Sequence, residues 1–126
     1  MLVVHVPASG KPRKVEIPDD DTLHGLQRLV GGGFIEIVRP RLLPKDWVMV
    51  VDDEGKLKDY PVNALGTILY DSPWDTINGD LILVREDFVP DEDGFMVPDL
   101  VGLTEEQADD CIRRFIPKAL RFSDMI

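Results

Sequence analysis

Two short segments near the start of the chain have residue patterns typical of β-strands. Residues 2–6 are almost wholly apolar, and residues 13–17 alternate polar with apolar side chains, as half-buried strands do. Prolines and a glycine occupy residues 7–12 between these runs, which is turn chemistry. The pattern predicts a β-hairpin at this end of the chain.

The apolar rhythm becomes helical over residues 23–30 and stops at Gly31, Gly32 and Gly33. A β-branched strand pattern follows at once over residues 34–38. Glycine adopts the left-handed conformation that commonly ends a helix without a Cβ penalty. A phosphate-binding loop has the opposite order of strand, glycines and helix. The glycines are therefore predicted to form a helix C-cap, and Gly32→Val is expected to destabilise the fold without selectively abolishing an activity.

Two later runs are apolar without alternation, at residues 47–51 and 81–84. Such runs are typical of strands that are covered on both faces. Residues 64–70 fit either a brief helix or an irregular strand, and the pattern leaves both open. Residues 89–103 are rich in acidic side chains and proline, and are predicted to be an acidic linker.

A last helix is predicted to begin at Thr104. Thr104 and Gln107 have the spacing of a capping box, in which each side chain bonds the backbone N–H of the other residue. Apolar side chains recur on one face of the following segment, and Pro117 is expected to end the helix. Cys111 lies on that apolar face and is most simply a small core residue.

These elements predict an α+β fold with a mainly antiparallel sheet and a C-terminal helix. Its strand–strand–helix–strand start is β-grasp-like in the order of elements, which carries no function with it. The expected division is a core domain over residues 1–88, the acidic linker over 89–103, and a C-terminal helix over 104–126 that packs on the core or on a partner.

Acidic side chains outnumber basic ones only in the later part of the chain. The 126 residues carry a formal charge of −10. Residues 1–45 hold 7 basic and 5 acidic side chains, giving +2, whereas residues 46–126 hold 7 basic and 19 acidic ones, giving −12. A field of this sign repels nucleic acid and favours basic protein surfaces. We therefore expect a protein partner with a basic surface, and no direct contact with nucleic acid.

Length and hydropathy are those of a soluble, single-domain protein. No apolar run approaches the roughly 18 residues of a membrane span, and the first residues lack the pattern of a signal peptide. With Cys111 as its single cysteine, the chain can form no internal disulfide. These features predict a cytoplasmic protein that does not contact a membrane.

Candidate catalytic and metal-binding groups are sparse. His5 and His24 lack neighbouring ligands at zinc spacing, and no serine lies in a nucleophile elbow. The acidic loops around Gly55 and Gly94 lack the oxygen ligands of an EF-hand. Residues 19–21 are three aspartates that are explained as capping charge for the first helix. The sequence predicts no enzyme activity, no metal and no cofactor.

A small set of basic side chains in the first part of the chain leaves two interpretations open. They form a weak nucleic-acid footprint without an aromatic stacking motif, or a docking face for an acidic partner. These residues are Lys11, Arg13, Lys14, Arg39, Arg41 and Lys45.

Three motifs in order resemble a family of small proteins known only as a domain of unknown function. They are Leu26–Val38, then Asp53–Leu57 with Pro61 and Asn63, then Ile77–Val84. The resemblance covers residues 1 to 88, and family members are encoded by bacteriophages, plasmids and actinobacterial or firmicute genomes. It implies a mobile-element context and little chemistry.

A second, shorter likeness lies in residues 97–115, which look like the start of a PASTA domain, a module of cell-wall-sensing kinases and penicillin-binding proteins. The chain ends before the sheet of such a domain could form. We interpret the segment as a capped helix of similar physics and expect no muropeptide binding.

The leading hypothesis is a non-enzymatic phage or mobile-element accessory protein that binds and modulates a host protein through an acidic surface. It follows from the charge of the later residues and the absence of catalytic groupings. The candidate contact residues are Asp52, Asp53, Glu54, Asp91, Glu92 and Asp93.

Two other classes of function stay open. An anti-defence DNA mimic would need carboxylates arrayed along one face like phosphates. A small-ligand-binding protein or modest hydrolase would need a pocket, for which Asp52, Asp53, Glu54 and Asn63 are the candidate polar residues.

Overall fold

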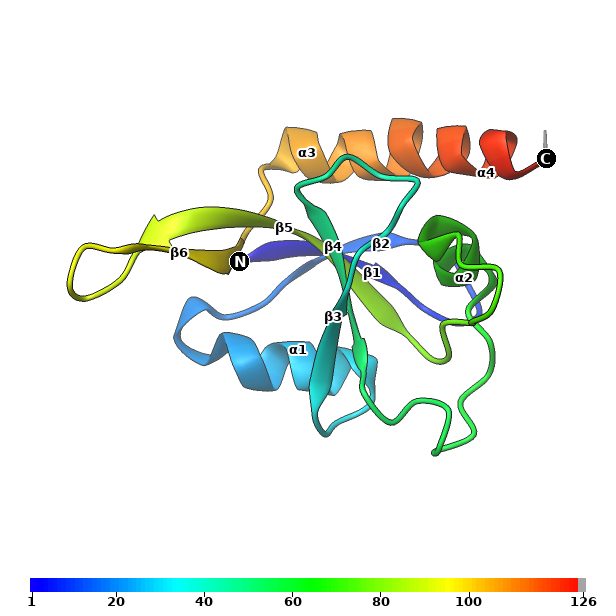
Figure 1. Ribbon diagram of the computed structural model, residues 1–126, viewed down its shortest axis with the longest axis horizontal. Coiled ribbons are helices and arrows are strands. Elements are labelled where there is room, and N and C mark those ends of the chain that lie inside the picture. Colours follow the sequence, from blue (N-terminus) through cyan, green and yellow to red (C-terminus); the bar gives the residue numbers. More distant parts are fainter. Residues whose placement is uncertain (125–126) are drawn as a thin grey trace.

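One antiparallel sheet of six strands organises the computed structural model, which describes residues 1–124 (Figure 1). Five strands follow the order β2-β1-β5-β4-β3, and β6 pairs with the outer half of β5. The strands are β1 (Leu2–Val6), β2 (Arg13–Glu16), β3 (Ile35–Val38), β4 (Trp47–Asp52), β5 (Leu81–Pro90) and β6 (Met96–Val101). The predicted α+β class, the N-terminal hairpin and the mainly antiparallel sheet are confirmed.

Helices cover both faces of this sheet (Figure 1). α1 lies on one side, and α3 and α4 run one after the other along the opposite side. The helices are α1 (Thr22–Val30), α2 (Ala64–Tyr70), α3 (Glu105–Asp110) and α4 (Ile116–Asp124), with a 3-10 turn at Asp19–Asp21 and a π-helical turn at Cys111–Phe115. The result is a helix–sheet–helix arrangement with two hydrophobic cores.

Strand β4 shows how one apolar run supplies both cores. All of its residues are buried, and successive side chains of a strand point to opposite faces. Val48 and Val50 pack with Leu26 of α1, whereas Met49 packs with the cluster that contains Cys111. The prediction that this run and residues 81–84 are covered on both faces is confirmed.

The three glycines end α1 as predicted. Gly31, Gly32 and Gly33 all have positive φ, at 126°, 78° and 134°. The Gly31 and Gly32 N–H groups both donate to the Gln27 carbonyl oxygen, at 3.1 and 2.6 Å. The Gln27 side chain in turn donates to the Gly33 carbonyl oxygen at 2.8 Å. Side chain and backbone together fix the turn from α1 into the strand that follows.

Residues 64–70, for which helix and strand were both open, form α2. The Asn63 side chain decides this, because its Oδ1 accepts the Gly66 N–H at 2.9 Å as an N-cap. The helix ends at Asp71 in a left-handed conformation with φ of 55°. A local pattern could not reveal this, since the cap residue is itself positioned by contacts far along the chain.

Residues 89–103 were predicted to be a linker without regular structure, and this prediction is wrong. Residues 96–101 form β6, which pairs with β5 from Arg85↔Val101 to Pro90↔Met96. Prolines are tolerated here because the ribbon has open edges, where a missing N–H costs no ladder hydrogen bond. Charge and proline content concealed a β-hairpin.

The predicted capping box at the start of α3 is confirmed, but Pro117 does not end the last helix. The Thr104 hydroxyl accepts the Gln107 N–H at 3.1 Å, and Gln107 Oε1 accepts the Thr104 N–H at 2.9 Å. Further on, α4 continues through Pro117 to Asp124. The π-helical turn before it widens the backbone, which accommodates a residue that lacks an N–H and crowds the preceding turn.

Cys111 begins that π-helical turn and is fully buried. The surrounding apolar core raises the pKa of its thiol to about 12, because burial disfavours the charged thiolate. Its predicted role as a small core residue is confirmed.

Candidate functional site

A two-stranded ribbon, which we name the arm, projects from the sheet (Figure 1). The arm comprises residues 87–99, from the Asp87↔Asp99 pair through the turn that joins β5 to β6. Its base follows directly from the part of β5 that lies between β1 and β4 in the sheet. The arm is thus an extension of the central strand, which gives it a firm attachment.

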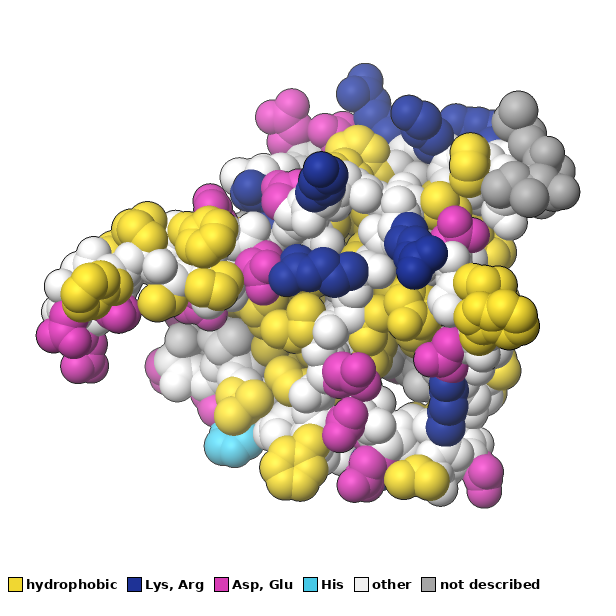
Figure 2. Space-filling model, in the orientation of Figure 1, with side chains coloured by type: hydrophobic (Ala, Val, Ile, Leu, Met, Phe, Trp, Pro, Cys, Tyr) yellow, Lys and Arg dark blue, Asp and Glu magenta, His cyan; other side chains and the backbone are white. Residues whose placement is uncertain are grey.

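The arm exposes large apolar side chains. Phe88, Phe95 and Met96 are 63%, 70% and 60% exposed, and Figure 2 shows hydrophobic side chains gathered on the arm with acidic ones at its tip. Residues 87–99 hold five carboxylates and no basic residue. Phe88 and Met96 lie on the same face of the ladder, and exposed apolar side chains gathered on a projecting ribbon indicate an interaction surface.

The tip of the arm is an ordered turn. Asp91 Oδ1 accepts the backbone N–H groups of Asp93 and Phe95, each at 2.9 Å. The Asp91 N–H donates to the Phe95 carbonyl oxygen at 2.8 Å, and Gly94 adopts φ of 85°. Asp91, one of the expected contact residues, therefore has a structural role. Glu92 and Asp93 remain exposed at the tip.

The other acidic candidates lie at the end of β4 and in the turn that follows it, and they differ in burial. Asp52 is buried, and its carboxylate receives the Lys58 ammonium at 2.7 Å and the Glu54 N–H at 2.8 Å. Asp53 and Glu54 are exposed. Asp52 thus orders the turn and has no free face for a partner.

A small cavity lies beside this turn, with a volume of about 140 Å³. Its wall includes Asp53 and Glu36, and partial burial together with the neighbouring Asp53 carboxylate raises the pKa of Glu36. Lys56 pairs with Asp75 at the same wall. Pockets for drug-sized ligands are typically about 300–1,000 Å³, so this cavity suits only a very small ligand.

Asn63 lies outside that cavity, although the sequence made it a pocket candidate. Its side chain is 1% exposed and makes three hydrogen bonds to the backbone. Its Nδ2 donates to the carbonyl oxygens of Val6 and Gly79, while Oδ1 caps α2. Asn63 is a structural residue that joins β1, α2 and the turn before β5.

Comparison with known families finds one match, which covers residues 1–116. The matching family is described as "Domain of unknown function (DUF3846)". The chain belongs to this family. Searches of curated proteins and of solved structures found no significant match. The match confirms the resemblance to a domain of unknown function, extends beyond the three motifs through the arm into the last helices, and names no enzymatic activity.

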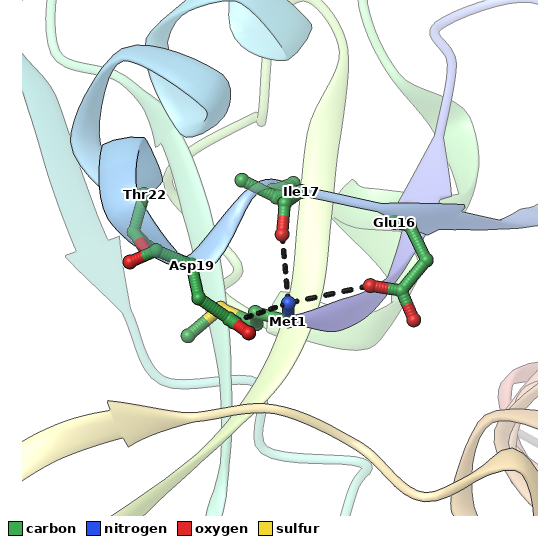
Figure 3. Close-up of polar contacts among 5 residues, drawn as sticks. All are labelled: Met1, Glu16, Ile17, Asp19 and Thr22. Atoms are coloured by element: carbon green, nitrogen blue, oxygen red, sulfur yellow. Dashed lines mark hydrogen bonds and ion pairs between the residues drawn. The ribbon is translucent and has the colours of Figure 1, made fainter.

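The N-terminal ammonium of this DUF3846 protein is held by three oxygen atoms (Figure 3). It donates to Asp19 Oδ1 at 2.6 Å, to the Ile17 carbonyl oxygen at 2.7 Å and to Glu16 Oε2 at 3.3 Å. The Asp19 hydrogen bond, assisted by Glu16, raises the pKa of the ammonium above its ordinary value of 8.0. The contacts fasten β1 to the residues that lead into α1. Asp19 thus binds the ammonium, and the N-cap residue of α1, Asp21, makes no side-chain cap hydrogen bond, so the predicted capping by these aspartates is wrong.

This ammonium predicts a loss of stability in mildly alkaline solution. Its raised pKa means that its contribution is complete below pH 8 and disappears as the pH rises through the higher value in the folded protein. The denaturation midpoint in urea should therefore fall as the pH rises above 8, and fall less in Asp19→Asn. The Cys111 thiol also weakens the fold above pH 9, but equally in both proteins. Identical slopes would contradict the assignment.

His5 is buried and belongs to a chain of polar groups that the sequence did not reveal. Arg13 Nε donates to His5 Nδ1 at 3.3 Å, which leaves His5 Nε2 to donate to Asp80 Oδ2 at 3.0 Å. Asp80 Oδ1 also accepts the Ala8 N–H at 2.8 Å. Among the described residues, no serine, threonine or cysteine side chain bonds this chain of groups, which therefore joins the β1–β2 hairpin to the start of β5.

Residues 1–124 contain neither a candidate metal-ion cluster nor a helix that could cross a bilayer. This part of the chain contains no group of three or more histidine, cysteine or acidic side chains placed to hold a metal ion. Nor does it contain a helix that is long and apolar enough to cross a bilayer. The arm is the feature of the described structure that most needs a functional explanation.

Local signals for the arm are present in the sequence, although the acidic composition obscured them. Short apolar runs flank Asp91–Gly94, and a glycine at the end of such a polar turn is typical of a β-hairpin loop. The exposed residues Phe88, Phe95 and Met96 are the site residues that sequence reasoning missed. Glu92 and Asp93 are the expected contact residues that lie beside them.

Proposed function

We propose that this member of the DUF3846 family is a non-enzymatic protein that binds another protein with its arm. The observation that carries the proposal is the exposed apolar surface of the arm together with its unbalanced acidic charge. A two-stranded ribbon is marginally stable on its own in water. Covering Phe88 and Phe95 on binding would stabilise both the ribbon and the complex.

The chemistry of the arm indicates the chemistry of its partner. Burial of one large apolar side chain contributes about 1.5–3 kcal/mol, so an apolar surface on the partner would supply most of the affinity. Basic side chains around that surface would meet Glu92 and Asp93, and would act mainly on association rate and specificity. We still expect the partner to have a basic surface, and we now place the acidic surface that meets it on the arm.

A host protein is the kind of partner that fits the proposed mobile-element context. The host identity and the mobile-element origin are parts of the proposal that rest on the three-motif resemblance alone. The arm would act on a host protein by occupying its surface.

The two alternatives receive less support from the geometry. Carboxylates interleave with basic side chains on the face in Figure 2, and several are paired, as in Arg85–Asp46 and Arg39–Glu86. A DNA mimic would present them as an uninterrupted array. The small-ligand alternative has the cavity beside two of its four candidate residues, Asp52 and Asp53, but Glu54 and Asn63 are not part of its wall.

A capture experiment tests the proposal. Tagged wild-type protein should retain a partner from lysate of cells that carry the gene, and the Phe88→Ser/Phe95→Ser variant should retain it about tenfold less or worse, since each 1.4 kcal/mol lost is tenfold in affinity. Trp74→Ser is the matched control, because Trp74 is 92% exposed on the loop after α2. Equal capture by the arm variant and wild type would overturn the proposal.

A further inference from the structure

A second apolar surface lies beside α4, on the face of the sheet opposite to α1 (Figure 1). It is a groove of about 370 Å³ between α4 and the loop that joins β3 to β4. Leu42 and Pro44 form its loop side, and Phe115, Ala119 and Phe122 form its helix side. Phe115 is fixed from behind by an edge-to-face contact with the buried ring of Trp47, at a centroid distance of 6.0 Å. The groove is therefore preformed.

Basic side chains surround the groove on a protein that is otherwise strongly acidic. Arg41 and Lys118 belong to its wall. The two segments that build it, residues 39–45 and 113–122, together hold seven basic residues and no acidic one. Two of the seven, Arg39 and Arg114, pair with Glu86 and Asp110. Figure 2 shows Lys and Arg side chains gathered over the layer of the last helices. The local charge is thus the reverse of the net charge.

The arm has the complementary chemistry. Its tip places Phe95, 70% exposed, next to Glu92 and Asp93. A tip that carries one exposed aromatic ring and two exposed carboxylates complements an apolar groove with an arginine and a lysine in its wall. Opposite charges at an apolar contact add register and specificity to the hydrophobic gain.

The arm does not reach the groove of its own molecule. Figure 1 shows the arm projecting from one end of the sheet, while α4 and the β3–β4 loop lie toward the other. Contact between the two surfaces therefore needs two molecules.

We propose that the arm of one molecule docks in the α4 groove of a second copy, with Phe95 in the groove and Glu92 and Asp93 against Lys118 and Arg41. The inference rests on the proposed function, because it requires the arm to be a binding element, and it names a second copy as one partner. Reciprocal docking of two arms gives a closed two-fold dimer, the commonest form of homo-oligomer. A host protein would compete with this dimer for the same arm.

Sedimentation of the purified protein tests the docking. Wild type should form a dimer of twice its 14.2 kDa. Arg41→Glu/Lys118→Glu and Glu92→Lys/Asp93→Lys should each raise the dimer dissociation constant about tenfold or more, because both variants place like charges together. The matched controls Lys11→Glu and Glu54→Lys change exposed charges outside both surfaces and should leave it unchanged.

Mixing the two charge-reversed proteins gives the sharper outcome. Each alone brings like charges together, whereas a mixed dimer pairs opposite charges at both contacts. We expect a one-to-one heterodimer with affinity close to that of wild type. A wild-type protein that stays monomeric up to about 1 mM, or a dimer insensitive to both reversals, would overturn the inference.

Failure of this inference is distinguishable from failure of the proposed function. If the protein is monomeric but still captures a partner through Phe88 and Phe95, docking to a second copy is wrong and the proposal that the arm binds a protein stands. If substitutions in the arm change neither self-association nor capture, both the docking to a second copy and the proposed function of the arm are wrong.

Discussion

Replacing Asn63 by alanine is expected to lower the free energy of unfolding by about 3–5 kcal/mol. Three backbone groups lose a buried partner: the carbonyl oxygens of Val6 and Gly79, at 3.1 and 3.0 Å, and the Gly66 N–H, at 2.9 Å. Each unsatisfied buried group costs about 1–3 kcal/mol, and loss of the N-cap is part of this total. Equilibrium denaturation in urea measures the change.

Asn78→Ala is the matched control for this prediction. Asn78 is only half-buried, and its side-chain Nδ2 donates to the Tyr60 carbonyl oxygen at 3.0 Å. Its Oδ1 also accepts the Thr76 hydroxyl at 2.7 Å. Each of these two hydrogen bonds, at a half-buried or exposed position, is worth about 0.5–1.5 kcal/mol. If Asn63→Ala cost no more than Asn78→Ala, the role of Asn63 in joining three elements would be wrong.

Replacing Gly31 by valine is expected to destabilise the protein by about 2–4 kcal/mol. At φ of 126° an L-residue is strained, at a cost of about 1–3 kcal/mol. A Cβ atom at this position would also lie 2.5 Å from the hydroxyl oxygen of Tyr60, and such overpacking adds to the strain. Thermal or urea denaturation of the purified variant gives the measurement.

Comparison with Gly32→Val separates the two causes. Gly32 has φ of 78°, and nothing lies within 4 Å of a Cβ atom placed there. Gly32→Val should therefore show backbone strain alone, about 1–2 kcal/mol for a left-handed L-residue. Tyr60→Ala should recover part of the loss in Gly31→Val and none of the loss in Gly32→Val. Equal recovery in both variants would contradict the role of Tyr60.

Elements whose signals are local were predictable from sequence. The Thr104–Gln107 capping box and the glycine C-cap of α1 depend on residues close together in the chain. The runs at 47–51 and 81–84 were recognisable as buried strands because their side chains are apolar on both faces. Periodicity and cap chemistry are sufficient for such features.

Features that depend on distant partners were not predictable in the same way. Strand β6 exists because β5 extends beyond the sheet and offers it a pairing edge, whereas its own composition is that of a linker. The last helix passes Pro117 because a π-helical turn precedes it. The burial of Asp52 depends on its pairing with Lys58 across a turn. Each outcome was decided by tertiary context.

The candidate site also has a part that was predictable from the sequence and a part that was not. The sequence predicted that acidic side chains contact the partner, and two of the predicted residues, Glu92 and Asp93, lie exposed at the tip of the arm. It could not show that Phe88, Phe95 and Met96 would stand exposed beside them, because an apolar residue in a predicted linker has no assigned face. The apolar part of the proposed contact emerges only from the hairpin.

Site-specific photo-cross-linking tests most directly the claim that the arm is a protein-binding element. A photoreactive phenylalanine analogue placed at Phe95 should cross-link to a protein partner, either a second copy or a host protein. The same analogue at the exposed control position Trp74 should not. Cross-links from position 74 alone, or from neither position under conditions in which wild type retains a partner, would contradict the account.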